Sequence, residues 1–233
     1  MNYLTKFRST SLSILFLLFF MPFATADIYV DRAIVRLAAD EEPRKDIKVI
    51  NNGDDVGYVE IEVFEVRNPG TEQEERVKVT DPEELKLIVS PSKLAIPANN
   101  QKLVRIVNLA PGENDERIYR VNVTPVLPPL QDDEGSVVRV VVAYQLLVII
   151  DPANPQEDLE IRREANQLFV KNNGNTNVLI SNGKQCEANE EACVDIAAHR
   201  VYPGNLWQVE LEKELPATLT LTNFNGVREF RTE

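Results

Sequence analysis

The sequence predicts an all-β protein made of two immunoglobulin-like β-sandwich domains joined at an angle by a short linker. Short segments rich in Val and Ile alternate with turn residues along the whole chain. No apolar period of 3.6 residues persists over three turns, so amphipathic helices are not expected. A Pro-containing stretch, Asp151–Pro155, separates a first series of strands from a second. Two successive series of closely spaced strands are typical of two small sandwiches.

The N-terminus carries the pattern of a secretory signal. Two basic residues, Lys6 and Arg8, precede a long apolar run that ends in small residues before Asp27. Residues 1–26 are therefore predicted to be a signal peptide cut after Ala26. No later segment reaches the roughly 20 apolar residues that a spanning helix needs, so no membrane insertion of the mature chain is expected.

Turn residues define the strands of the first predicted domain, residues 27–151. Gly provides positive φ and Pro fixes φ while removing a donor, as at Asn51–Asp54 and Asn68–Gly70. The strands expected between such turns are 28–37, 46–51, 57–66, 75–80, 84–90, 101–107, 116–126 and 136–150.

The second predicted domain covers residues 152–233. Asn172–Asn175 has the composition of a hairpin turn. Cys186 and Cys193 lie seven residues apart in an exported chain, which predicts a local disulfide. The strands expected here are 158–162, 166–172, 176–182, 192–198, 206–212, 217–223 and 226–232.

Composition argues against several classes of function. A formal net charge of −12 is the wrong sign for a nucleic-acid-binding protein. His199 is the only histidine, so with two thiols it cannot complete a metal site, and no metal or other cofactor is expected. There is no glycine-rich phosphate loop and no hydrolase nucleophile motif, so an enzyme is not expected. Trp207, the only tryptophan, is a poor platform for sugars, which disfavours an exported hydrolase or carbohydrate-binding module.

The stretch 137–150 is far longer than an average strand and almost wholly apolar. Arg139 and Gln145, its two polar side chains, share one face. Two interpretations remain open: a central core strand, or a strand made to pair with another chain, since long exposed apolar edges are normally avoided. The wholly apolar face consists of Val138, Val140, Val142, Tyr144, Leu146, Val148 and Ile150.

Four stretches resemble the periplasmic pilus-assembly chaperones of the chaperone–usher pathway. They are DRAIV from Asp31, LIVSPSKLAIPANNQKLVRI from Leu87, ERIYRVNVTPVLPP from Glu116, and the long run 137–150. The likeness is strongest to the divergent, alternate branch typified by chaperones of the common pilus. NNGNTNVLI in the second domain, the paired cysteines and Tyr202-Pro203-Gly204 resemble that branch as well.

The resemblance implies a periplasmic chaperone whose partners are pilin subunits and an outer-membrane usher. It would bind them through donor-strand complementation, with 137–150 laid into an open groove of the pilin. A self-capping dimer of the free chain is a further partner state that the resemblance leaves open. The alternative is a structural or adhesive pilus component, but there the donor segment should lie at the mature N-terminus. The side chains expected to face the groove are Val138, Val140, Val142, Tyr144 and Leu146, whereas Val148 and Ile150 should lie in the chain's own core.

In the family, two basic residues of the interdomain cleft anchor the terminal carboxylate of the pilin. Arg32 matches the first of them by motif, and a guanidinium suits bidentate carboxylate binding. The second, a lysine, has no counterpart at 145–147, and Arg120 or Arg139 are the candidate substitutes.

The resemblance also implies a salt bridge between the domains. Here only its acidic half is visible, since Glu116 is present but Asp151 stands where an arginine is typical.

Overall fold

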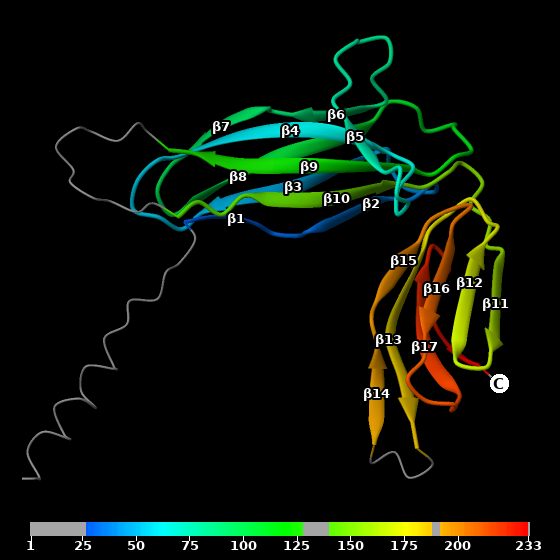
Figure 1. Ribbon diagram of the computed structural model, residues 1–233. Coiled ribbons are helices and arrows are strands. Elements are labelled where there is room, and N and C mark those ends of the chain that lie inside the picture. Colours follow the sequence, from blue (N-terminus) through cyan, green and yellow to red (C-terminus); the bar gives the residue numbers. More distant parts are fainter. Residues whose placement is uncertain (1–26, 128–139, 188–191, 233) are drawn as a thin grey trace, which may run out of the picture.

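The computed structural model describes residues 27–127, 140–187 and 192–232. Every helix or strand in these ranges is a strand, which confirms the all-β prediction. The strands form two sandwiches in sequence order, β1–β10 and then β11–β18 (Figure 1). The second sandwich projects from one end of the first, and the strands of the two run in different directions.

One sheet of the first sandwich has four antiparallel strands in the order β1-β3-β8-β6. Their bounds are β1 Ile28–Val30, β3 Arg44–Asn51, β8 Asn100–Asn108 and β6 Leu87–Ser90.

The facing sheet has the order β2-β10-β9-β4-β5, and β7 also pairs with β4. All its pairs are antiparallel except β2 with β10, which run parallel. The bounds are β2 Ile34–Leu37, β10 Tyr144–Ile150, β9 Arg117–Val126, β4 Gly57–Arg67, β5 Glu75–Val77 and β7 Lys93–Ile96.

The stretch predicted as one strand over 28–37 is divided between the two sheets. β1 pairs with β3 in one sheet, and β2 pairs with β10 in the other. The chain crosses between them at Asp31, whose backbone N–H donates to the Lys48 carbonyl and whose carboxylate accepts from the Lys48 N–H. This pair of bonds ends the β1–β3 ladder and redirects the chain.

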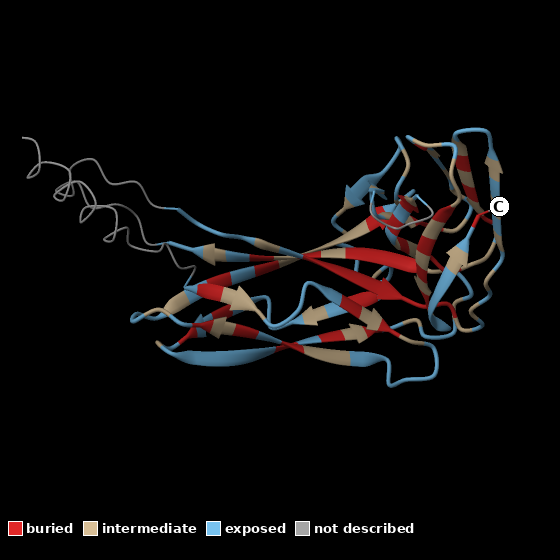
Figure 2. Ribbon diagram, turned by 90° about the horizontal axis from the view of Figure 1, so that it is seen from below, coloured by how far each residue is buried: buried red, intermediate tan, exposed pale blue. Residues whose placement is uncertain are grey.

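The second sandwich packs a three-stranded sheet, β11-β12-β16, against a sheet ordered β14-β13-β17-β18 in which β15 also pairs with β13. In both sandwiches buried and exposed residues alternate along the strands, as Figure 2 shows. The bounds are β11 Leu159–Glu164, β12 Gln167–Asn172, β13 Val178–Cys186, β14 Cys193–Ile196, β15 His199–Val201, β16 Leu206–Glu210, β17 Ala217–Asn223 and β18 Gly226–Arg231.

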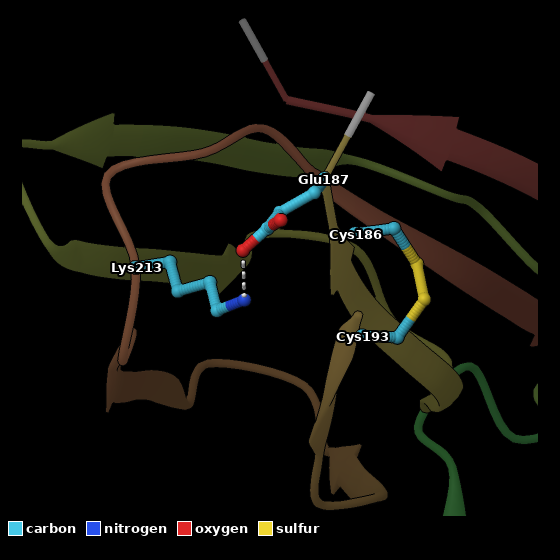
Figure 3. Close-up of a disulfide and its surroundings, with 4 residues drawn as sticks. All are labelled: Cys186, Glu187, Cys193 and Lys213. Atoms are coloured by element: carbon cyan, nitrogen blue, oxygen red, sulfur yellow. Dashed lines mark hydrogen bonds and ion pairs between the residues drawn. A yellow bond between two sulfur atoms is a disulfide. The ribbon is translucent and has the colours of Figure 1, made fainter. Parts of the chain in front are cut away.

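The predicted disulfide is confirmed: Cys186 and Cys193 are bonded at 2.05 Å (Figure 3). They face each other in register, Cys186 at the end of β13 and Cys193 at the start of β14. Next to the bridge, the Lys213 ammonium lies 3.0 Å from the Glu187 carboxylate. The bridge closes the outer end of this hairpin.

Candidate functional site

β10 is covered unequally by its two neighbours. β9 pairs with it along its whole length, from Tyr144↔Val123 onward. β2 pairs with β10 only over its last residues, beginning at Leu147↔Ile34. Among the described residues, the backbone of β10 before Leu147 therefore has no ladder partner on the β2 side. This is an open sheet edge, to which another strand can be added.

The apolar face of β10 runs from the core of the first sandwich out to solvent. Val148 and Ile150 are fully buried in that core, and Tyr144 packs partly against it. Further out, beyond the start of the strand, Val140 is 83% exposed and Val142 is 43% exposed. Apolar side chains of one register thus pass continuously from protected to unprotected positions.

Two of the side chains expected to face a pilin need comment. Leu146 is fully buried in the chain's own core, so the exposed part of the apolar face does not include it as the sequence predicted. The burial follows from the β9 ladder, in which Leu146 lies opposite Val121. Val138 lies outside the described residues, as does Arg139.

A groove of about 540 Å³ adjoins the exposed end of this face. Its apolar lining includes Tyr58, Val126 and the segment 140–142, all of them exposed. Acidic side chains, among them Asp54 and Asp55, stand on its border. The exposed apolar surface therefore extends from the open edge of β10 to the outer end of the sandwich.

At the opposite end of β10, one row of side chains crosses three strands. Leu147 lies in register with Ile34 of β2 on one side and with Arg120 of β9 on the other. Ile34 is half exposed, and the buried Nε of Arg120 has no hydrogen-bond partner among the described residues. Arg120 is therefore a guanidinium with an unused donor, flanked by apolar side chains.

Arg32 lies just before β2, on the side of the open edge. Its side chain is 49% exposed and forms an ion pair with the neighbouring Asp31 at 2.8 Å. It is two residues before Ile34, the first residue of β2 to pair with Leu147.

The contact between the sandwiches has an apolar centre. Tyr202, which follows β15, packs with Leu147 and Ile149 of β10, together with Val66 and Ile118. Nearby, the Asn205 amide donates to the Pro69 carbonyl at 2.8 Å. The row that contains Arg120 therefore lies next to the second sandwich.

A family comparison identifies the class of protein. Residues 27–156, more than half of the chain, match the model described as "Pili and flagellar-assembly chaperone, PapD N-terminal domain". The chain belongs to this chaperone family. The structural or adhesive pilus component that the sequence left open is not favoured.

Similar proteins and structures agree with this assignment. The chaperone is 27% identical over 170 residues to a CS1 fimbrial protein of Escherichia coli, covering 68% of this chain and 71% of the relative. Its fold matches that of the class 5 fimbriae chaperone CfaA with a TM-score of 0.64 at 21% identity, covering 88% and 99% of the two chains. It also matches a Salmonella enterica structure of the SafA pilin in complex with the SafB chaperone, with a TM-score of 0.61 at 15% identity, covering 90% and 97%.

Charged side chains of the chaperone surround the apolar centre of the contact. Arg36 of β2 supplies the cation that the sequence comparison missed, since its Nε donates to both carboxylate oxygens of Asp151 at 2.9 Å. Glu116 accepts hydrogen bonds from the backbone N–H of Asn177, at 2.8 Å, and from its side-chain amide. Burial raises the pKa of Glu116 to about 7. Arg200 in turn donates to the Asn177 side-chain oxygen, and burial lowers the pKa of Arg200.

Sequence reasoning gave no role to Arg36 or Arg200. Arg36 stands in an ordinary alternating strand, and Arg200 is in a strand that was not predicted. A polar residue in a short strand is usually a solvated one, so nothing in the pattern distinguishes either arginine.

Among the described residues no His, Cys, Asp and Glu side chains gather into a group of three that could hold a metal ion. Within the same residues, no helix is long and apolar enough to cross a bilayer. His199 stacks on Trp207 with ring centroids 5.0 Å apart, and Trp207 packs against the core of the second sandwich. Both aromatic side chains are thus engaged in packing.

Proposed function

We propose that this chaperone captures pilin subunits by adding the open edge of β10, with the segment that precedes it, to an incomplete pilin sandwich. The observation that carries the proposal is the apolar face of β10 leaving the core beside an unpaired backbone edge. An added strand gains main-chain hydrogen bonds, and alternate side chains fill pockets. Burying one valine contributes roughly 1.5–3 kcal/mol, so each exposed valine of the apolar face adds substantially to binding.

The side chains proposed to enter the pilin are Val138, Val140, Val142 and Tyr144. They share the register of the buried Val148 and Ile150, so a bound pilin would extend the core of the first sandwich.

We further propose that Arg120 binds the terminal carboxylate of the pilin. Support comes from its buried Nε without a partner among the described residues, and from its place beside Leu147, at the contact with the second sandwich. A guanidinium stays charged when buried and can bind a carboxylate with two parallel hydrogen bonds. Arg32, which already pairs with Asp31, would act further out along the edge.

The proposed setting is the periplasm, with delivery of the bound pilin to an outer-membrane usher. The predicted signal peptide and the disulfide both suit an oxidising exported compartment. A solved structure of the same fold is that of the periplasmic chaperone SfaE, with a TM-score of 0.58 at 15% identity.

Two valines with the same exposure provide the decisive test. Val141 and Val142 are both 43% exposed but project to opposite faces of the segment. Co-purification of a pilin from the same gene cluster should be abolished by Val140→Asp with Val142→Asp. It should survive Val141→Asp, the matched control. Equal loss in both variants, or capture by the double variant, would refute the assigned face.

Arg120 is tested with a pilin C-terminal peptide in two forms, one ending in a free carboxylate and one amidated. Arg120→Ala should lower the affinity for the free acid by tenfold or more and leave the amidated form unchanged. Arg32→Ala serves as the comparison. A loss that is equal for both peptides would show that Arg120 does not bind the carboxylate.

A further inference from the structure

Glu116 forms a polar contact between the two sandwiches. It immediately precedes β9 in the first sandwich, and its Oε2 accepts both the backbone and the side-chain N–H of Asn177 in the second. Asn177 is fully buried. The other oxygen of Glu116, Oε1, is also buried and has no hydrogen-bond partner among the described residues.

The charges around Glu116 do not neutralise it. Arg36 is the nearest cation on its own sandwich, but its Nε is held by both oxygens of Asp151. Asp151 is itself close to Glu116, since Ile150 and Arg117, their neighbours in sequence, pair in register. Two carboxylates thus share one guanidinium, and like charges at this spacing disfavour the ionisation of both.

The second sandwich adds two more titratable groups, Arg200 and Tyr202. Arg200 donates to the Asn177 side-chain oxygen rather than to Glu116. The Tyr202 hydroxyl is neutral near pH 7, because burial raises its pKa above the usual value of 10.0. Neither group supplies a hydrogen bond to the unpartnered oxygen of Glu116 among the described contacts.

We infer that the two sandwiches are joined by a proton-dependent contact: Glu116 is neutral when they are docked and becomes charged as they separate. A neutral carboxyl still accepts both N–H groups of Asn177 through its carbonyl oxygen. A charged one would leave a buried anionic oxygen without a donor, which is costly. Separation exposes Glu116 to water, where it ionises freely.

The sign of the effect follows from the pKa of Glu116, which burial raises from 4.5 to about 7 in the docked state. Below pH 4.5 both the docked and the separated state hold the proton, and the contact has its full strength. Between pH 4.5 and about 7 only the docked state holds it, so docking weakens by up to tenfold per pH unit. Above about pH 7 neither state holds it, and the contact remains at its weaker level.

Hydrogen exchange of one amide tests this contact on the full chaperone without any pilin. The Asn177 N–H is protected by Glu116, so its protection factor measures how often the contact opens. In the wild type we expect this factor to fall by up to tenfold per pH unit between pH 4.5 and 7. The Asn172 N–H, bonded to Asn205 within the second sandwich, should show a constant factor.

Glu116→Gln, which stays neutral and keeps an acceptor oxygen, should make the Asn177 protection factor independent of pH. Asp115→Asn, an exposed neighbour, should behave as the wild type. A 13C titration of the Glu116 side chain in the wild type checks the same point without a substitution, with a midpoint expected near pH 7. A midpoint near 4.5, or the same pH slope in Glu116→Gln as in the wild type, would overturn the inference.

Discussion

Arg36 and Asp151 are 115 residues apart in sequence, and the Nε of Arg36 lies 2.9 Å from each carboxylate oxygen of Asp151. Arg36 belongs to the edge strand β2, and Asp151 directly follows β10. The side chain of Asp151 is only 2% exposed. The pair therefore fastens β2 to the end of β10, at the point where the chain leaves the first sandwich.

Removing the cation of this pair should be strongly destabilising. Arg36→Ala leaves the buried Asp151 without its partner, which costs about 3–5 kcal/mol in the free energy of unfolding. Urea unfolding measures the change. Arg105→Ala is the matched control, because Arg105 pairs with Asp46 at the surface and the side chain of Arg105 is 52% exposed. Such a pair contributes about 0–1 kcal/mol, so similar losses in the two variants would contradict the assigned role of Arg36.

The disulfide should stabilise the second sandwich on its own. Cys186 and Cys193 close a loop with a sequence separation of seven, for which the chain-entropy estimate is about 2–3 kcal/mol. Serine at both positions should lower the free energy of unfolding of the second sandwich by about this amount. Trp207, the only tryptophan, belongs to that sandwich, and its fluorescence reports the transition. The reduced wild type should match the double variant, and unchanged stability in both would exclude the stabilising role.

Tyr202 should hold the two sandwiches in one orientation. Tyr202→Ala removes the aromatic ring that packs between Leu147 and Ile149, at a cost of about 3–5 kcal/mol. We expect the two sandwiches then to tumble with separate correlation times in 15N relaxation measurements. Tyr58→Ala, at an exposed position, is the control and should change neither stability nor tumbling. A single correlation time in Tyr202→Ala would show that the polar contacts alone fix the orientation.

The pH dependence of the second sandwich should have the opposite sign to that of Glu116. The hydrogen bond from Arg228 is the main cause that lowers the pKa of Glu157 below 4.5, and Asn223 and Asn225 donate to the same carboxylate. Its contribution to stability is therefore complete above about pH 4.5 and is lost as the pH falls through the lowered pKa. Glu157→Gln should remove this acid-dependent loss in a pH series of urea unfolding. A slope below pH 4.5 that is identical in wild type and variant would contradict it.

Much of the fold could be predicted from sequence because alternation and turn residues are local signals. The strand 57–66 and the hairpin 217–232 are examples, since both appear with nearly the expected bounds. β7, at Lys93–Ile96, was missed because prolines on both sides read as turns. The division of 28–37 was also missed, since it depends on the bonds between Asp31 and Lys48, which are distant in sequence.

The candidate site was predictable only in its periodic part. The apolar register of 137–150 follows from the sequence, but the depth at which it enters the core does not, so Leu146 was placed on the wrong side of that limit. The limit is set by where β9 begins to pair, at Tyr144↔Val123. The partnership of Arg36 with Asp151 could not be predicted either, because it needs the parallel pairing of β2 with β10.

The burial of Leu146, Val148 and Ile150 has a consequence for selectivity. These three side chains fix the phase of the strand, so the outer valines are held at a set distance from the body of the chaperone. Side chains of one face recur about every 6.6 Å along a strand, and the chaperone thus acts as a ruler with marks at fixed intervals. Inserting one residue between Val142 and Tyr144 would shift every mark to the wrong face. A client would then be chosen by the spacing of its pockets as well as by their size.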